Sequence, residues 1–565
     1  MIEDARSLSS RELIDADILI IGGGAAGISL ALNFIGKNLK VVILESGGLT
    51  YERQTQALYR GDNVGLRYEP LDLCRVRIFG GSTDKRGWAG WCKIFRELDF
   101  ETRDWVAHSG WPISKSDLEP YYRKALKTVM LPPDLEKLSE KEAQAEDSLP
   151  LNGDCVNEPV ALSTAPHLSE TFQDIIKASQ NIRVILHANV ARIETDCDGR
   201  TVTAVHFETL GHQHFCIEPR FTVIAAGGIE TARLMLISDQ TVKPGLGNVS
   251  GWVGRCFMDH PRYGWGQISA VSDPSRLLRY NPTHGVGRRR YGVPPAGAPP
   301  LFGAGIALSD AAQKRERTLG SRTWILPVAR QGERDGGREL REVVLWATRH
   351  RIPSDIVLRT RKIIGDVPNA AAAVLAHLRS IAGQSARWHF VTILEPEPNP
   401  DSRVLLDSKT DQFGLRRVKL DWRLTPLAQH TLQVTQRLIV NDLQSRGIGC
   451  LVEGQGGPLA NQKFEEPRWV WHHMGTARMS ENPCQGVVDA NCKVHGMNNL
   501  YVAGSSVFPT CANDMPTLTL MALAFRLADH LWLQMSASQC ANIETTPPAR
   551  MTPVFAAPEG VQALE

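Results

Sequence analysis

Two short segments far along the chain carry side chains that can move or hold protons. Residues 471–476 read WHHMGT and contain His472 and His473, while residues 513–519 read NDMPTLT and begin with Asn513. The unperturbed pKa of histidine lies close to neutral pH, which suits a general base, and a nearby polar group can hold the oxygen of a substrate. Adjacent histidines cannot easily ligate one ion, and no His, Cys and carboxylate cluster has metal-ligand spacing, so no metal site is predicted.

The other chemistry-bearing segment lies at the opposite end of the chain. Residues 17–27, DILIIGGGAAG, place Gly22, Gly24 and Gly27 in a G-x-G-x-x-G pattern between an apolar run and a helical pattern. Gly22 permits a tight turn, Gly24 lets the backbone approach a pyrophosphate, and Gly27 lets helix and strand pack closely. The helix N-terminus would face the phosphates with free N–H groups. The pattern predicts a dinucleotide site, and the alternative is a glycine-rich turn without a ligand.

An acidic residue follows at the distance that such a site requires. Glu45 ends the second apolar run, 18 residues after Gly27. A carboxylate at this point can accept hydrogen bonds from ribose hydroxyls, and it argues against the 2′-phosphate of NADP. These residues alone do not decide whether the bound dinucleotide is NAD or FAD.

Apolar patterning predicts the elements that position these residues. Residues 17–21 and 40–44 are expected to be strands around a helix at 25–33, which is the opening of a doubly wound α/β fold. Further strands are predicted within 181–193, 202–207, 221–226, 387–394, 403–407 and 416–422, and further helices at 231–237 and 425–444. Residues 288–290, 294–300 and 332–338 are interpreted as surface loops or a lid.

Composition narrows the class of protein. The chain has 565 residues, enough for more than one domain, and 63 Lys and Arg against 61 Asp and Glu. This near-neutral balance gives no argument for nucleic acid or an acidic membrane. The 11 cysteines form no C-x-x-C pair, residues 1–14 lack an apolar signal segment, and the apolar stretch 370–378 is too short to span a bilayer. We therefore expect a soluble cytoplasmic protein with reduced cysteines, bound to neither membrane nor nucleic acid.

Motifs along most of the chain resemble those of the glucose–methanol–choline (GMC) oxidoreductase family. Before the C-terminal block they are FGGST at 79–83, WAGWC at 88–92, SGWPI at 109–113, LEPYY at 118–122, AAGGIET at 225–231, GRCFMDHP at 254–261 and PNPDSRV at 398–404. The C-terminal block is the most specific, with H-x-x-GT at 472–476, GVVD at 486–489, LYVAGSS at 500–506 and PTLT at 516–519. Only the region from about 265 to 385 shows no clear match.

The resemblance implies a two-domain architecture. A doubly wound, Rossmann-like FAD-binding domain would comprise residues 12–110, 178–262 and 460–538. An α+β substrate-binding domain with a large antiparallel sheet would comprise residues 111–177 and 263–459. Residues 539–565, rich in Ala, Pro and Thr, are predicted to be a disordered tail.

The resemblance also names the cofactor and the residues expected to hold it. The cofactor would be FAD, and Val190 would meet its adenine through backbone atoms. The expected cofactor-binding residues are Gly22, Gly24, Ala25, Ala26, Gly27, Glu45, Ser46, Gly80, Gly81, Ser82, Trp88, Gly90, Trp91, Val190, Ala226, Gly227, Gly504, Ser505, Pro516 and Thr517. Some family members carry a histidine just before the flavin-lining Trp that bonds covalently to FAD. Residues 84–87, DKRG, contain none, so FAD is predicted to be non-covalent.

The family's chemistry implies roles for the C-terminal residues. His472 would be the base that deprotonates an alcohol while hydride passes to flavin N5, and Asn513 would be its catalytic partner. Many members place the Asn directly before the Pro, but here Asp514 and Met515 intervene, so Asp514 is the competing candidate. The side chain of His473 should point elsewhere, and a structural role is favoured for it.

The expected partners are a small-molecule alcohol and an electron acceptor. The alcohol would be a sugar, a polyol or a natural-product hydroxyl, and the acceptor oxygen or another compound. Two alternatives stay open: a lyase that keeps FAD without using its redox chemistry, and a binding protein that has lost activity. The basic stretches 288–290 and 359–362 are interpreted as solvated surface, with recognition of an acidic substrate or a carrier protein as the alternative.

Overall fold

The computed structural model describes a defined part of the chain. The described residues are 1–9, 13–83, 90–165, 167–269, 271–282, 300–327, 336–337, 339–340, 343–344, 356–381, 387–451 and 467–544. Several predictions therefore lie outside the described residues, namely those on Trp88, on residues 84–87 and 288–290, and on nearly all of 294–300 and 332–338.

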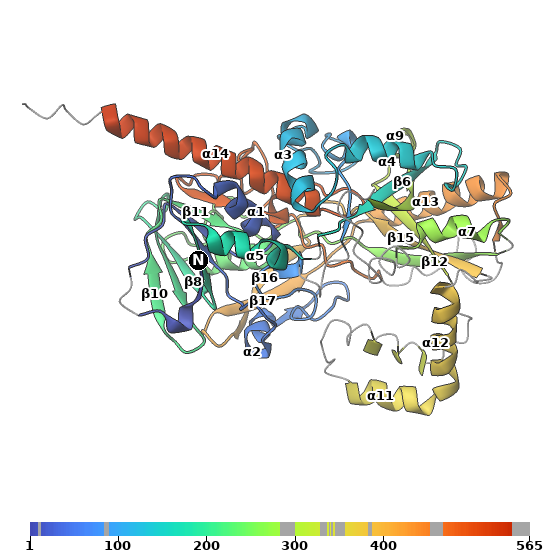
Figure 1. The fold of residues 1–565 in the computed structure, drawn as a ribbon, viewed down its shortest axis with the longest axis horizontal. Helices are drawn as coiled ribbons and strands as arrows, with labels where there is room; N and C mark the ends of the chain where they lie inside the picture. The colour runs from blue at the N-terminus through green and yellow to red at the C-terminus, as the bar shows by residue number, and fades with distance from the viewer. Residues whose placement is uncertain are drawn as a thin grey trace, which may run out of the picture.

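A six-stranded parallel sheet forms one half of the molecule (Figure 1). Across the sheet the strands are β1 (Ile2–Asp4), β7 (Ile182–Leu186), β3 (Val41–Leu44), β2 (Ile18–Ile21), β11 (Phe221–Ile224) and β19 (Leu500–Val502). Every residue of β2 and β3 is buried, which explains why both strands read as unbroken apolar runs. The predicted doubly wound sheet is confirmed, and β1 adds an edge strand that precedes residue 12, where this domain was expected to begin.

Three helices pack together beside this sheet (Figure 1). They are α1 (Ala25–Phe34), α5 (Leu168–Ala178) and α14 (Thr517–Glu544). Next to them, α3 (Lys115–Thr128) packs against α14, and the hydroxyl of Tyr122 lies 2.8 Å from that of Thr519. Residues 111–177 were predicted to lie in the other domain. Of this range α3 instead packs here, because the buried face of α3 and the apolar body of α14 cover each other, whereas residues 155–162 form a strand of the antiparallel sheet.

The end of α14 also corrects the predicted tail. The helix continues to Glu544, six residues beyond position 538, where disorder was expected to begin. Residues 539–544 contain no proline or glycine, and the first proline after them is Pro547, so nothing in this stretch stops a helix. Residues 545–565 lie outside the described part of the chain.

The other half of the molecule is built on a seven-stranded antiparallel sheet. Its order is β18 (Cys450–Leu451), β12 (Arg262–Ser269), β15 (Arg387–Leu394), β14 (Ser321–Pro327), β13 (Leu301–Leu308), β6 (Cys155–Leu162) and β5 (Trp91–Cys92). Helix α13 (Pro426–Ser445) buries its apolar side against β15, β14 and β6. The large antiparallel sheet implied by the resemblance is therefore confirmed. β5 belongs to it although residues 12–110 were assigned to the other domain, because Trp91 packs in its core.

Two smaller sheets and several short helices complete the described fold. The strands β8 (Asn189–Thr195), β9 (Val202–Glu208) and β10 (His214–Ile217) form an antiparallel meander, and β16 (Arg403–Thr410) pairs with β17 (Arg416–Asp421), which runs parallel to β4 (Gly61–Asn63). Helix α6 (Gly227–Ile237) packs against β8, β16 and β17. The short helices are α2 (Arg53–Gln56), α4 (Leu135–Ala143), α7 (Pro274–Leu277) and α9 (Asp310–Glu316).

The region without a motif match contributes structure that the patterning did not predict. Strands β13 and β14 and helix α9 come from residues 300–327, and their apolar side chains are core positions. Helices α11 (Ile356–Gly365) and α12 (Val367–Ile381) extend away from the rest of the chain (Figure 1). None of the helices in the described residues is long and apolar enough to cross a membrane.

Candidate active site

The glycine-rich turn after β2 has the geometry that its sequence predicts. Gly22 has φ +113°, and a Cβ there would lie 2.5 Å from the carbonyl oxygen of Ala225. A Cβ on Gly27 would lie 2.1 Å from the carbonyl oxygen of Gly22, so only glycine lets α1 approach β2 this closely. A Cβ on Gly24 would meet nothing within 4 Å, because this residue borders an open cleft.

The N-terminus of α1 is arranged to receive an anionic group. Gly24 is its N-cap, and no side chain caps the helix. Ala25 and Ala26, in the first turn, line the cleft. Free N–H groups and the helix dipole favour a phosphate at such a position. The cradle therefore fits the pyrophosphate of a dinucleotide.

Glu45 joins the turn after β2 to the turn after β3. One carboxylate oxygen accepts the backbone N–H of Gly23 at 2.8 Å, and the other accepts that of Gly47 at 2.8 Å. Burial raises the pKa of Glu45 although these bonds oppose the shift. Each oxygen keeps a second lone pair, and Glu45 lines the cleft, so the predicted ribose contact remains a prediction.

The cleft gathers most of the residues that the resemblance assigned to the cofactor. It encloses about 1900 Å³ of empty space, part of it open to solvent. Fifteen of the predicted residues line it, namely Gly22, Gly24, Ala25, Ala26, Glu45, Ser46, Gly81, Ser82, Val190, Ala226, Gly227, Gly504, Ser505, Pro516 and Thr517. Of the others that the structure describes, Gly27 lies behind the turn, Gly80 and Gly90 do not line the cleft, and Trp91 is buried in β5.

Sequence reasoning missed a group of charged residues in the same cleft. Glu230 forms ion pairs with Arg75 at 2.9 Å, Arg77 at 3.0 Å and Arg233 at 3.3 Å. Burial alone would raise the pKa of Glu230, but the three arginines outweigh it and lower this pKa to about 2. Both Arg75 and Arg77 also stack on the ring of Tyr59. Arg75 and Arg77 lie in no motif, and Glu230 lies in the AAGGIET motif without an assigned role. Only the tertiary fold brings positions 75 and 230 together.

His472 lines the same cleft and lies in a turn that is held by several hydrogen bonds. The residue before it, Trp471, has φ +68°, a left-handed conformation that costs a bulky side chain energy. The carboxylate of Asp259 accepts the backbone N–H groups of Trp471 at 3.0 Å and His472 at 2.9 Å. The buried hydroxyl of Tyr68 donates to the same carboxylate and lies 3.0 Å from the Nε2 of His473. His473 is thus part of the support for the turn.

The imidazole of His472 is anchored by one nitrogen. Its Nδ1 lies 3.2 Å from the Nδ1 of His260 and 3.6 Å from a carboxylate oxygen of Asp514. The side chain is 27% exposed and borders the cleft, and its Nε2 has no hydrogen-bond partner among the described residues. The geometry therefore leaves Nε2 available to a molecule bound in the cleft.

The structure does not bring Asn513 to this point. Its amide is fully buried, accepts a hydrogen bond from Lys93, and donates to Glu158 at 2.9 Å and to the carbonyl of Ser321 at 3.0 Å. These partners belong to the antiparallel half of the molecule. The prediction of a substrate-facing Asn513 is therefore corrected, because the two inserted residues turn its side chain into the sheet and set Asp514 beside His472.

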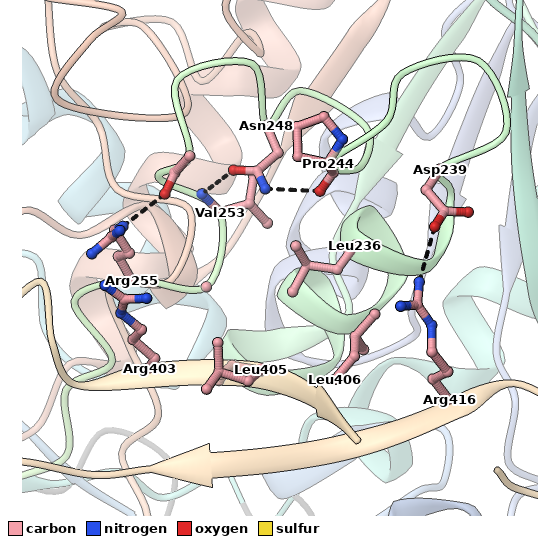
Figure 2. Close-up of a pocket in the computed structure, with 13 residues that line it drawn as sticks. Leu236, Asp239, Pro244, Asn248, Val253, Arg255, Arg403, Leu405, Leu406 and Arg416 are labelled. Carbon is pink, nitrogen blue, oxygen red and sulfur yellow. Dashed lines mark hydrogen bonds and ion pairs between the residues drawn. The ribbon is translucent and has the colours of Figure 1, made fainter. Parts of the chain in front are cut away.

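A second cavity lies between α6, the loop at 239–255 and the β16–β17 hairpin (Figure 2). Its charged groups are already bonded within the chain. Arg255 donates to the carbonyl of Pro400, Arg416 pairs with Asp239 at 3.0 Å, and the side chain of Asn248 bonds to the backbone of its own loop. These contacts brace the loop against the hairpin, and none of the predicted site residues lines this cavity.

Fold and cleft together define a dinucleotide-binding oxidoreductase with a histidine that lines its cofactor cleft. Family models support this class: one described as FAD dependent oxidoreductase matches residues 17–331, and one described as GMC oxidoreductase matches residues 398–524. The chain belongs to the GMC family of FAD-dependent oxidoreductases. The predicted family and the predicted cofactor, FAD, are thereby confirmed.

Individual relatives resemble this chain over nearly its whole length. The 2-methyl-1,2-propanediol dehydrogenase of Mycolicibacterium austroafricanum is 23% identical, with 94% of this chain and 97% of that protein covered. The 6'''-hydroxyparomomycin C oxidase of Streptomyces lividus is 23% identical, with 93% of each covered. A crystal structure of formate oxidase shares the fold, with a TM-score of 0.56, 17% identity, and 93% of this chain and 99% of that chain covered.

Proposed function

We propose that this enzyme oxidises a hydroxyl group of a small molecule to a carbonyl, with His472 as the base. The observation that carries the proposal is the orientation of the His472 ring, whose Nδ1 lies next to His260 and Asp514. His472 lines the cleft, and its Nε2 has no hydrogen-bond partner among the described residues. Bound FAD supplies the acceptor for the hydride that leaves the carbon. The hydroxyl proton passes to Nε2 of His472 as the C=O bond forms.

The surroundings of His472 suit a base that becomes charged during the reaction. Asp514 places a carboxylate 3.6 Å from Nδ1, where it stabilises the imidazolium. Asp259 fixes the backbone of the turn through two N–H bonds, so the ring keeps its place when its charge changes. We therefore assign the role of partner to His472, left open between Asn513 and Asp514, to Asp514, which acts through His472.

The names of the relatives suggest the class of substrate. One is named for 2-methyl-1,2-propanediol and another for 6'''-hydroxyparomomycin C. We extend this to a polyol, a sugar or a natural-product hydroxyl for the present enzyme. The absence of a histidine at residues 84–87 supports non-covalent FAD. Release of all flavin into the supernatant after acid precipitation would agree with this, and flavin retained in the pellet would contradict it. We further propose that the protein is cytoplasmic and that the reduced flavin passes its electrons to oxygen or to another acceptor.

The test is anaerobic reduction of the bound flavin by candidate alcohols. We expect His472→Ala to retain FAD and to slow flavin reduction by about 10²–10⁴-fold, the usual contribution of a general base. The matched control is His430→Ala, because His430 is an exposed histidine on α13 that does not line the cleft. Unchanged single-turnover reduction in His472→Ala would contradict the proposal.

The same measurement separates oxidation from the lyase alternative. An oxidoreductase loses the visible absorbance of oxidised flavin when its alcohol is added without oxygen. A lyase of the same fold would leave this absorbance unchanged with every alcohol while it cleaves a C–C bond.

A further inference from the structure

His260 is a fully buried histidine whose two ring nitrogens both meet partners. Its Nε2 lies 3.2 Å from the carbonyl oxygen of Ala512, and its Nδ1 lies 3.2 Å from the Nδ1 of His472. The two imidazole planes meet at 87°. His260 is thus in direct contact with the candidate base.

The proton positions follow from what each partner can do. A backbone carbonyl only accepts, so the bond to Ala512 requires a proton on the Nε2 of His260, and the Sγ of Cys511, 3.9 Å from the same nitrogen, can also accept. A neutral His260 then has a lone pair at Nδ1, and its bond to His472 requires that His472 donate from its own Nδ1. This arrangement leaves the lone pair of a neutral His472 on Nε2, the nitrogen that borders the cleft.

The environment keeps His260 neutral. Burial lowers the pKa of this imidazole to about 3, and the nearby His472 and Lys93 act in the same direction. Asp514 and the carbonyl of Ala512 oppose this shift only in part. A protonated His260 would also turn an N–H toward the N–H of His472 and lose the bond between the rings.

We propose that His260 is a positioning residue that fixes the tautomer of His472, so that the proton-accepting nitrogen is the one that borders the cleft. The inference rests on the proposed function, in which His472 is the base. His260 borders no part of the cleft, so it acts only through His472.

The loop before Pro516, which differs from the family pattern, contacts both histidine rings, that of His260 and that of His472. Ala512 has φ +56° and Met515 has φ +57°, so the loop bends sharply through left-handed conformations at two non-glycine residues. In this shape Ala512 offers its carbonyl to His260, and Asp514 offers its carboxylate to His472. The two residues that depart from the family pattern thus lie in the loop that supplies an acceptor for one ring and a counter-charge for the other.

Nitrogen NMR of the FAD-loaded enzyme with ¹⁵N-labelled histidine tests the proposal directly. The signals of His472 are assigned as those that disappear in His472→Gln. We expect the neutral His472 of the unmodified enzyme to be protonated at Nδ1 and bare at Nε2. Protonation at Nε2 would overturn the proposal, whatever the enzyme's activity. A divalent cation that elemental analysis finds bound, and whose removal changes these signals, would overturn it too.

Two substitutions separate the tautomer effect from simple packing. His260→Asn keeps an acceptor oxygen near the position of Nδ1, and His260→Leu removes it. We expect His260→Leu to move His472 toward the Nε2–H tautomer and to slow flavin reduction by about 10- to 1000-fold, the scale of an error in tautomer or in general-base action. His260→Asn should keep the Nδ1–H signal and most of the rate. An unchanged His472 signal in His260→Leu would contradict the inference, whereas failure of His472→Ala to slow reduction would contradict only the proposed function.

Discussion

A carboxylate oxygen of Asp259 accepts the backbone N–H of His472 at 2.9 Å, although the two residues are 213 positions apart in the chain. The other oxygen accepts the N–H of Trp471, whose φ of +68° is unfavourable for so large a residue. A strained turn persists only where its surroundings over-determine it, and Asp259 does so here. The contact places the candidate base on a rigid support.

Asp259→Asn should therefore weaken both the turn and the reaction. The amide that replaces the carboxylate has only one acceptor oxygen. Its NH₂ group would therefore face one of the two backbone N–H groups, of Trp471 or His472, that now bond to the carboxylate. We expect a loss of about 1–3 kcal/mol in the free energy of unfolding, together with slower flavin reduction. Urea unfolding and anaerobic reduction of the FAD-loaded enzyme measure the two effects. The control is Asp401→Asn, at an exposed carboxylate, and equal behaviour of the two variants would contradict this role.

Two glycines in one turn should respond differently to alanine. In Gly27→Ala the new Cβ meets the carbonyl oxygen of Gly22, so we expect loss of folding or of the α1 position. In Gly24→Ala the Cβ meets no protein atom within 4 Å, and φ is −80°, so the free energy of unfolding of the apoprotein should change by no more than about 0.5 kcal/mol. FAD affinity should nevertheless fall by about tenfold or more, since that Cβ occupies the cleft. Equal destabilisation of the two apoproteins would refute this distinction.

Substitutions at the neighbouring positions 513 and 514 should distinguish a residue that stabilises the fold from one that assists flavin reduction. Asn513→Ala removes a buried amide with three hydrogen bonds, so we expect it to lower the free energy of unfolding by about 1–3 kcal/mol with little change in flavin reduction. Asp514→Asn keeps the shape and removes the charge near His472, so we expect reduction to slow by about tenfold or more with little change in stability. The reverse pattern would restore Asn513 as the catalytic partner.

Glu230 should make stability depend on pH in acid. Its pKa in the folded chain is about 2, below the ordinary value of 4.5, so its stabilising contribution is present above pH 4.5 and is lost as pH falls toward 2. We expect Glu230→Gln to be most destabilising at pH 7, with a difference from the unmodified enzyme that shrinks below pH 4.5. Urea unfolding at several pH values measures it. Glu218→Gln, at an exposed position, is the control, and a difference that is the same at pH 7 and pH 3 would contradict the assignment.

Patterning predicted the parallel half of the fold well, and the reason is local. β2 and β3 are wholly buried and short, and Gly27 is required by its contact with the carbonyl oxygen of Gly22 in the same turn. Gly22, by contrast, is required by its positive φ and by its close approach to Ala225 on a neighbouring strand end. Strands β13 and β14 were not predicted, although they lie inside the antiparallel sheet. Their surroundings in the sequence are rich in Pro, Gly and Arg, and their partners β6 and β15 lie far from them in sequence.

The same difference between local patterns and long-range contacts applies to the candidate site. His472, Glu45 and the glycines stand in motifs, so their places in the cleft could be anticipated. Arg75 and Arg77 lie in no motif, and the motif that contains Glu230 predicted no role for it, because the common property of the three residues is a contact across the fold. Asn513 was expected at the substrate, yet its amide satisfies a buried Lys93–Glu158 pair that no spacing rule reveals.

The sequence by itself determined the dinucleotide turn, the family and the residue most suited to act as a base, since each depends on residue types at short spacing. The tertiary structure decided which groups surround that base. Asp259, His260 and Asp514 reach His472 from more than 40 positions away, and hydrogen bonds of about 3 Å depend on how distant segments pack. The nitrogen that accepts the proton is set by such a contact, which no local pattern encodes.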